Sequence, residues 1–321
     1  LVGDDDAIWV GSMGGGARKI VADASYTKDL SRASGGGLTT PLIRDIAADA
    51  HGAIWFATPA GLFHYLESTW IDDIMGADGQ DPRLNAINDL LYDSQGRLWV
   101  ATAGAGIRLN RPSLTGFTNI VYNRTAGHLP SNGVNAVEED GEGGIWAGTF
   151  NGLSRFHQGI WTTHLLSDTL PSLVITDLLA KDDGMWIGTE DGLIYYDSLT
   201  NTVTVVSELE DHLVETLAAD GLGNLWVGTA TNGIWTLSDN GWQHMAHDPN
   251  KAGTLPGNQI SIGGLARDPM SDSGMWANIL EIGLVYWDGH RWHLRSNELP
   301  NSVLYRLYSE PMSGDLWFGS E

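Results

Sequence analysis

The chain has 321 residues, with 17 Lys and Arg against 40 Asp and Glu, and its formal net charge is −23. Affinity for nucleic acids and for anionic membrane surfaces depends on clustered Lys and Arg, so we expect neither as a partner. The absence of Cys excludes disulfides and thiolate chemistry, and without a run of eighteen apolar residues we expect no membrane insertion of this segment.

Eight copies of one short pattern run through the chain. Each copy has a Trp between apolar residues, usually followed by Gly-Thr or a related pair. The repeated residues are Trp9, Trp55, Trp99, Trp146, Trp186, Trp226, Trp276 and Trp317. They are 46, 44, 47, 40, 40, 50 and 41 residues apart. This period is typical of a four-stranded propeller blade.

The same elements are expected in the same order within each repeat. An apolar first strand, such as residues 134–140, ends at an acid six residues before the Trp, and a Gly-rich turn leads into the second strand that carries the Trp. A Gly six or seven residues later, such as Gly152, allows positive φ where the third strand begins. A further large residue, such as Trp161, marks a fourth, outer strand. The repeated Trp is then expected to fill the space between blades.

Two segments show the repeat most completely. Residues 134–153 read VNAVEEDGEGGIWAGTFNGL, and residues 214–234 read VETLAADGLGNLWVGTATNGI. This arrangement resembles the repeat of the two-component regulator propeller family, and the resemblance covers the whole chain. It implies a periplasmic or extracellular ligand-sensing propeller that signals to a histidine kinase elsewhere in the protein. The repeats depart from the pattern at Ala277-Asn278, which replace Gly-Thr, and at Lys181, where an acid is usual.

We therefore predict an all-β fold, a β-propeller of four-stranded antiparallel blades. Seven intervals between tryptophans favour seven blades, with residues 302–309 supplying the first strand that is missing before Trp9. Eight blades are the alternative. We expect residues 1–321 to form a single propeller domain. Both ends fall inside a repeat, which indicates a fragment of a longer protein.

One position of the first strand varies from repeat to repeat. It directly follows an apolar residue and is occupied by Arg44, Asn88, Asn135, Thr176, Glu215, Gly263 and Tyr305. A purely structural ring would repeat one residue type, as the Trp positions do. The mixture of donors and acceptors favours a ligand site formed by Arg44, Asn88, Asn135, Glu215 and Tyr305 at the channel mouth, where several blades meet. The alternative is that these side chains satisfy loop backbone groups or water.

Motifs for catalysis and for metal binding are missing from the sequence. There is no phosphate-binding Gly-rich loop with Lys, no His-Glu-x-x-His, no EF-hand loop and no Gly-x-Ser-x-Gly. We therefore expect no enzyme activity, no catalytic residue, no metal and no cofactor. Glu215 and His212 are the one pair that suggests acid-base chemistry, but their spacing on a strand would place them on opposite faces.

Three classes of function follow from these observations. The resemblance favours an extracytoplasmic sensor domain, periplasmic or extracellular, that binds a small polar ligand such as a glycan fragment. A cell-surface scaffold that binds another protein through its loop face is the first alternative. An enzyme similar to streptogramin lyase, which is also a Trp-repeat propeller, is the second.

Overall fold

The structure is a computed structural model. It describes residues 7–11, 17–21, 27–29, 43–49, 53–66, 69–73, 86–113, 116–164, 171–295, 304–309 and 316–320. Side chains are described for residues 43–49, 53–64, 86–109, 121–164 and 171–295 and for Leu307. The chain divides into two compact units, Arg44–Asp211 and the combination of Leu1–Ile43 with His212–Glu321. Whether they act as one domain stays a prediction.

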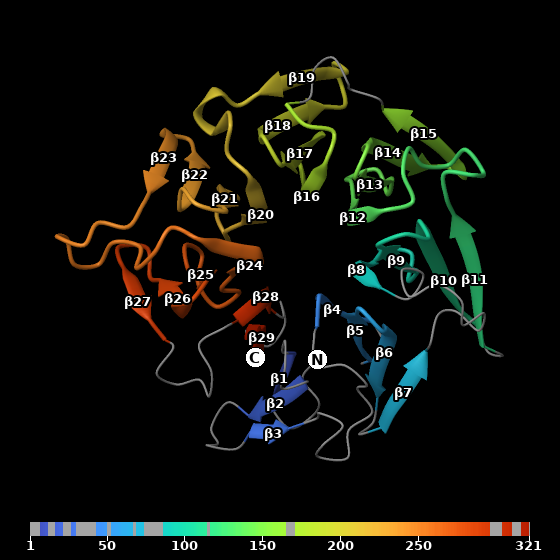
Figure 1. Ribbon diagram of the computed structural model, residues 1–321, viewed down its shortest axis with the longest axis horizontal. Helices are drawn as coiled ribbons and strands as arrows, with labels where there is room; N and C mark the ends of the chain where they lie inside the picture. Colours follow the sequence, from blue (N-terminus) through green and yellow to red (C-terminus); the bar gives the residue numbers. More distant parts are fainter. Residues whose placement is uncertain are drawn as a thin grey trace. The chain divides into compact units, whose positions relative to one another are not determined.

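The unit Arg44–Asp211 contains four antiparallel sheets, each with its four strands in chain order (Figure 1). The strands of the first two sheets are β4 Asp45–Ala48, β5 Ile54–Thr58, β6 Gly61–Leu66, β7 Thr69–Asp73, β8 Ile87–Tyr92, β9 Leu98–Thr102, β10 Ile107–Ser113 and β11 Gly116–Tyr122. Those of the next two are β12 Val134–Glu139, β13 Ile145–Thr149, β14 Gly152–His157, β15 Ile160–His164, β16 Ile175–Lys181, β17 Gly184–Thr189, β18 Gly192–Asp197 and β19 Thr202–Val205. A 3₁₀ turn, Ser207–Leu209, follows β19.

The other unit contains two four-stranded sheets and two smaller ones. The four-stranded sheets are formed by β20 Val214–Ala219, β21 Leu225–Thr229, β22 Ile234–Ser238, β23 Gly241–Met245, β24 Ile260–Arg267, β25 Met275–Ile279, β26 Gly283–Trp287 and β27 Trp292–Leu294. The smaller sheets are formed by β1 Ala7–Gly11, β2 Ala17–Val21 and β3 Thr27–Asp29, and by β28 Leu304–Ser309 and β29 Leu316–Ser320.

The all-β class and the four-stranded antiparallel blade are confirmed, but the expected number of blades is wrong. In the described residues, six sheets have four strands, not seven or eight. Strand β28 pairs with β29, whereas β1 lies beside β29. Each repeated Trp marks the second strand of a repeat, so the number of these tryptophans does not give the number of complete four-stranded sheets. The second strands of the first and last repeats belong to the three-stranded and two-stranded sheets, so eight repeats give six four-stranded blades.

Within each unit, the first strands of successive sheets are neighbours. Strand β8 lies beside β4 and β12, and β12 lies beside β16; in the other unit β20 lies beside β24. The apolar side chains between the sheets form the core. Trp99, which is fully buried, packs with Val134, Val137 and Phe156 of the following sheet. The inter-blade role predicted for the repeated Trp is confirmed here, and Trp55, Trp146 and Trp226 lie in equivalent clusters.

In four of the described repeats, an acid six residues before the Trp is the hydrogen-bond acceptor of its indole. Nε1 of Trp99 donates to Oδ2 of Asp93 at 2.7 Å, and the equivalent bond from Trp146 to Asp140 is 2.8 Å. Trp55 and Trp226 make the same bond to Asp49 and Asp220. A buried indole N–H requires a partner. The spacing of acid and Trp in the sequence therefore has a structural role, because it supplies the buried indole with its hydrogen-bond acceptor.

The Thr that follows the Trp stabilises the turn between the second and third strands. Oγ1 of Thr149 donates to the carbonyl of Gly152 at 2.8 Å and accepts from the amide of Asn151 at 3.0 Å. The φ of Gly152 is 106°, a conformation that other residues rarely adopt. Thr58, Thr102, Thr189 and Thr229 repeat the bond. Most recurring features of the repeat are thus structural.

In the described part of the chain, no helix has the length and apolar character needed to cross a membrane.

Candidate functional site

The first strand of several sheets carries one extra residue. In β8, Ile87 pairs with Thr102 and Asp89 pairs with Ala101, so Asn88 lies between them without a cross-strand residue of its own. The corresponding extra residues are Asn135 in β12, Thr176 in β16 and Glu215 in β20. Such a β-bulge redirects a side chain away from the regular alternation. The bulge falls at the position whose variety suggested a ligand site.

Three of the predicted site residues are joined in a row that crosses three sheets. Nη1 of Arg44, just before β4, donates to Oδ1 of Asn88 at 2.5 Å. Nδ2 of Asn88 donates to the carbonyl of Val134 at 2.9 Å and lies 3.4 Å from Oδ1 of Asn135. Nδ2 of Asn135 donates to the carbonyl of Ile175 at 2.8 Å. We call Arg44, Asn88 and Asn135 the polar row.

The polar row is ordered and still accessible. All three side chains are half-buried. Burial lowers the pKa of Arg44 from its ordinary value. Each Asn uses its amide nitrogen to reach the next sheet, which fixes the direction of its carbonyl oxygen. The row therefore offers a preformed set of donors and acceptors to a polar molecule.

The structure does not relate the other two predicted site residues, Glu215 and Tyr305, to the polar row. Glu215 belongs to the other unit, where it is half-buried and burial raises its pKa. The side chain of Tyr305, in β28, lies outside the described residues. Their membership of one site with the polar row stays a prediction. His212 is bound to Nδ2 of Asn232 through Nε2 at 2.7 Å, and no described contact joins it to Glu215.

Carboxylates on the first strands hold neighbouring sheets together, a role that the sequence reasoning missed. Oδ2 of Asp45 accepts from the amide of Leu90 at 2.7 Å, and Oδ2 of Asp89 accepts from the amide of Val137 at 2.8 Å. Both acids follow the pattern Ile-x-Asp at the start of the first strand. That repeated spacing is the signal that would have identified them.

A third carboxylate makes a similar bond one sheet further along. Oε1 of Glu138 accepts from the amide of Ala180 at 3.2 Å. Burial raises the pKa of Glu138 to about 8, and the nearby carboxylates of Asp177, Asp89 and Glu139 add to the effect. Asp45, Asp89 and Glu138, on the same first strands or beside them, therefore already accept hydrogen bonds from backbone amides of the next sheet.

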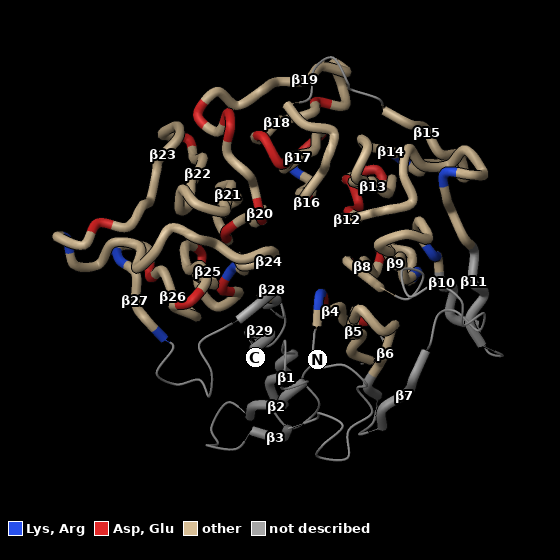
Figure 2. Tube along the Cα trace, in the orientation of Figure 1, with Lys and Arg blue, Asp and Glu red and all other residues tan. Residues whose placement is uncertain are grey.

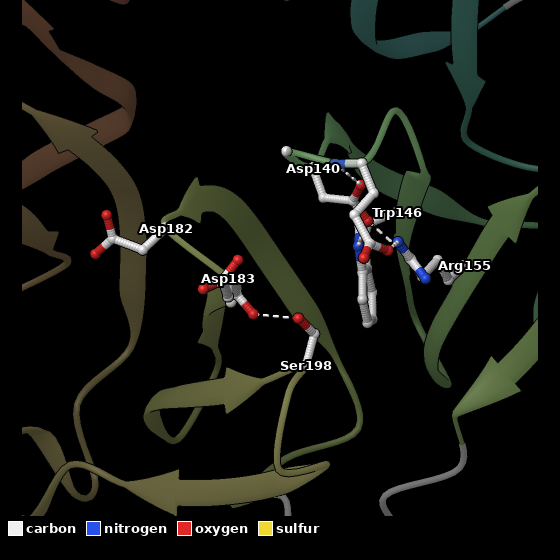
Figure 3. A pocket seen from close by; sticks show the side chains of 9 residues that line it. Asp140, Trp146, Arg155, Asp182, Asp183 and Ser198 are labelled. Carbon is white, nitrogen blue, oxygen red and sulfur yellow. Dashed lines mark hydrogen bonds and ion pairs between the residues drawn. The ribbon is translucent and has the colours of Figure 1, made fainter.

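A pocket lies between the turns that join β12 to β13 and β16 to β17 (Figure 3). Arg155 and Trp146 form one side, and Asp182, Asp183 and Ser198 form the other. Sequence reasoning did not point to it, because its two sides come from different repeats and its repeat residues, Asp140 and Trp146, have a structural role in the blade.

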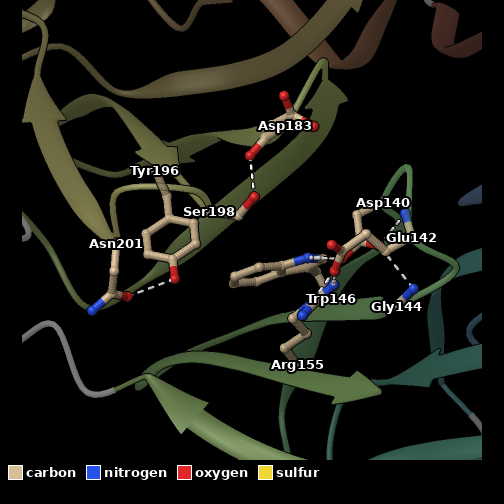
Figure 4. A network of polar contacts seen from close by, with 9 residues as sticks. All are labelled: Asp140, Glu142, Gly144, Trp146, Arg155, Asp183, Tyr196, Ser198 and Asn201. Atoms are coloured by element: carbon tan, nitrogen blue, oxygen red, sulfur yellow. Dashed lines mark hydrogen bonds and ion pairs between the residues drawn. The ribbon is translucent and has the colours of Figure 1, made fainter. Parts of the chain in front are cut away.

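The side of the pocket that contains Arg155 is a closed network (Figure 4). Nε of Arg155 donates to Oδ2 of Asp140, and Nη2 donates to Oε2 of Glu142, both at 2.7 Å. The guanidinium also lies over the ring of Trp146, 5.7 Å from its centre. Gly144 allows this close approach, since a Cβ there would lie 2.6 Å from Oδ2 of Asp140. The network connects the turn between β12 and β13 to Arg155 of β14.

Among the residues that the structure describes, no group of three or more His, Cys, Asp or Glu side chains is arranged to hold a metal ion.

Comparison with known families identifies the repeat. The model of a family described as "Two component regulator propeller" matches residues 82–104 and 128–151, which include Trp99 and Trp146. The chain therefore carries two-component regulator propeller repeats, as its sequence pattern predicted. A search of curated proteins found no match to this chain.

Solved structures with the same fold include an extracellular domain of a putative two component system and two lyases. The extracellular domain of the putative hybrid two component system BT3049 from B. thetaiotaomicron has a TM-score of 0.64 at 18% identity, with 98% of this chain and 49% of that chain covered. This chain thus spans about half the length of that domain. A streptogramin B lyase has a TM-score of 0.63 at 15% identity, with coverage of 88% and 92%.

A second lyase has a similar score. The virginiamycin B lyase of Staphylococcus aureus, in a catalytically inactive form with quinupristin, has a TM-score of 0.62 at 10% identity, with 99% of this chain and 93% of that chain covered. At these identities the likeness shows the propeller fold alone, because one fold supports many functions.

Proposed function

We propose that this chain is the ligand-binding part of an extracytoplasmic sensor, periplasmic or extracellular, and that it recognises a small polar ligand such as a glycan fragment. The observation that carries the proposal is the polar row. Three side chains from three sheets lie next to one another, although 44 and 47 residues separate successive members in the sequence.

The chemistry of the row supports a hydroxyl-rich ligand. An amide side chain offers both a donor and an acceptor, and a sugar hydroxyl can use either. The hydrogen bonds between sheets hold the side chains before a ligand arrives, which reduces the entropy that binding has to overcome.

The repeats and the fold of the BT3049 domain support the sensor role. In this proposal the signal passes to a kinase outside residues 1–321. The same resemblance supports an extracytoplasmic location, since that solved domain is extracellular.

Calorimetric titration against a panel of neutral and acidic oligosaccharides tests the proposal. We expect at least one member to bind, and we expect Asn88→Ala and Asn135→Ala each to weaken binding by about 5- to 100-fold, since each removes a hydrogen bond and disturbs its neighbour. Gln95→Ala is the matched control, because Gln95 is exposed in the turn at the opposite end of β8. Equal binding by Asn88→Ala, Asn135→Ala and the parent would refute the site.

A protein-binding scaffold and a lyase-like enzyme are the alternatives, and each predicts a different result. A scaffold would bind no oligosaccharide and would retain a protein partner after substitution of the row. A lyase would turn over a streptogramin substrate, which chromatography of the product would detect. Neither alternative requires a row of ordered polar side chains, so the sensor is preferred.

A further inference from the structure

Arg44 is an unusual cation for this chain. The sequence has 40 Asp and Glu against 17 Lys and Arg, so a half-buried guanidinium should easily find a carboxylate. Among the described residues, however, its side chain makes one hydrogen bond, to the neutral amide of Asn88. In Figure 2, acidic and basic positions are both spread over the described chain, and a basic position lies at the start of β4.

The nearest acids in the sequence are engaged elsewhere. The carboxylate of Asp45 accepts from the amide of Leu90, and that of Asp89 accepts from the amide of Val137. Each of these acids directly follows a member of the polar row in the sequence. Burial lowers the pKa of Arg44.

Among the described residues, only one donor of the Arg44 guanidinium is engaged. It has five N–H donors in a planar fork that matches the two oxygens of a carboxylate. The bond from Nη1 to Asn88 uses one of these donors and fixes the orientation of the plane. An anion at Arg44 would make short, charge-assisted hydrogen bonds, while Asn88 and Asn135 would bind hydroxyl groups beside it.

We infer that the ligand of the polar row is acidic, namely an oligosaccharide with a uronic acid residue whose carboxylate binds Arg44. This inference rests on the proposed function and names the ligand class of the same site. Arg44 selects the charged sugar, and the two Asn side chains bind its hydroxyl groups.

The test compares oligosaccharides that differ in charge. Calorimetric titrations use trimers of galacturonate and mannuronate, the neutral trimers of galactose and mannose, and acetate as a free carboxylate. We expect a uronate trimer to bind at least tenfold more tightly than its neutral counterpart and than acetate. Arg44→Gln should abolish this preference with a loss of about 10- to 100-fold. Arg44→Lys should retain part of it, because Lys keeps the charge but not the fork.

Arg124→Gln is the matched control, since Arg124 is exposed in the same unit, and circular dichroism verifies that each variant is folded. Equal binding of uronate and neutral trimers, or a preference that survives Arg44→Gln, would overturn the inference while the proposed function stands. Tighter binding of acetate alone would also overturn it. If no trimer of either kind binds, both the inference and the glycan-binding function fail.

Discussion

Removal of Trp226 should test the inter-blade core directly. Its side chain is 3% exposed, and its ring lies 6.1 Å from that of Trp292 and 6.4 Å from that of Trp287, which both belong to the following sheet. Its Nε1 donates to Oδ2 of Asp220 at 3.2 Å. After Trp226→Ala, that oxygen still accepts from the side chain of Asn224 at 2.8 Å. The cost should therefore come mainly from lost packing.

Two estimates of this cost agree. Burial of about 200 Å² of aromatic surface at about 25 cal/mol per Å² corresponds to about 5 kcal/mol, as an upper value. Large-to-small substitutions of buried aromatic residues cost about 3–5 kcal/mol of unfolding free energy. We expect Trp226→Ala to fall in that range. Urea titration followed by far-UV circular dichroism measures it, with the denaturant slope as the check that unfolding stays cooperative.

Trp235→Ala is the matched control, because Trp235 belongs to the same sheet and is only half-buried, stacked 4.2 Å from the ring of His244. It should lose less than half as much unfolding free energy as Trp226→Ala. Equal losses for the two variants, or a Trp226→Ala variant as stable as the parent, would show that the repeated Trp does not carry the core between sheets.

Three further predictions concern the acids and the net charge. Asp89→Ala should cost about 1–3 kcal/mol of unfolding free energy, because the buried amide of Val137 loses its acceptor, whereas the exposed Asp191→Ala should change urea stability little. The pKa of Glu138 is raised from 4.5 to about 8, so its contribution to stability is complete below pH 4.5 and is lost as the pH rises through about 8. Glu138→Gln should remove that decline. If the urea midpoint of the Glu138→Gln variant fell between pH 5 and 9 as much as that of the parent, the assignment to Glu138 would be wrong. Because the net charge is −23, we expect the protein to pass through a column of immobilised DNA at physiological salt. Retention at that salt, with release only at high salt, would disprove this.

Local patterns made most of the blade predictable. A short turn between two alternating apolar runs specifies a hairpin, and the acid six residues before the Trp specifies the partner of its indole. The large residue at the outer strand was also predicted, and Trp161 lies in β15 as expected. The number of complete sheets was not predictable in this way, because it depends on hydrogen bonds between strands that the repeat spacing does not connect.

The site shows the same division. The sequence identified the position in each first strand at which residue types vary, and three residues at that position are joined by hydrogen bonds or lie within 3.4 Å of one another. It did not show the bulge that redirects Asn88 and Asn135, since no residue type marks an extra residue in a pleated strand. It also did not show that Arg44 lacks a carboxylate partner among the described residues, because that depends on where every nearby acid is engaged.

The sequence by itself determined the all-β class, the order of the strands within each repeat, the buried Trp between sheets and the variable polar position. These features depend on residues within one repeat, where apolar alternation and turn chemistry act over a few residues. The tertiary structure alone decided the six four-stranded sheets, the contacts of the polar row and the engagement of Asp45 and Asp89. Those contacts join residues 44 to 48 positions apart, and only the packing of successive sheets brings such residues within hydrogen-bond distance.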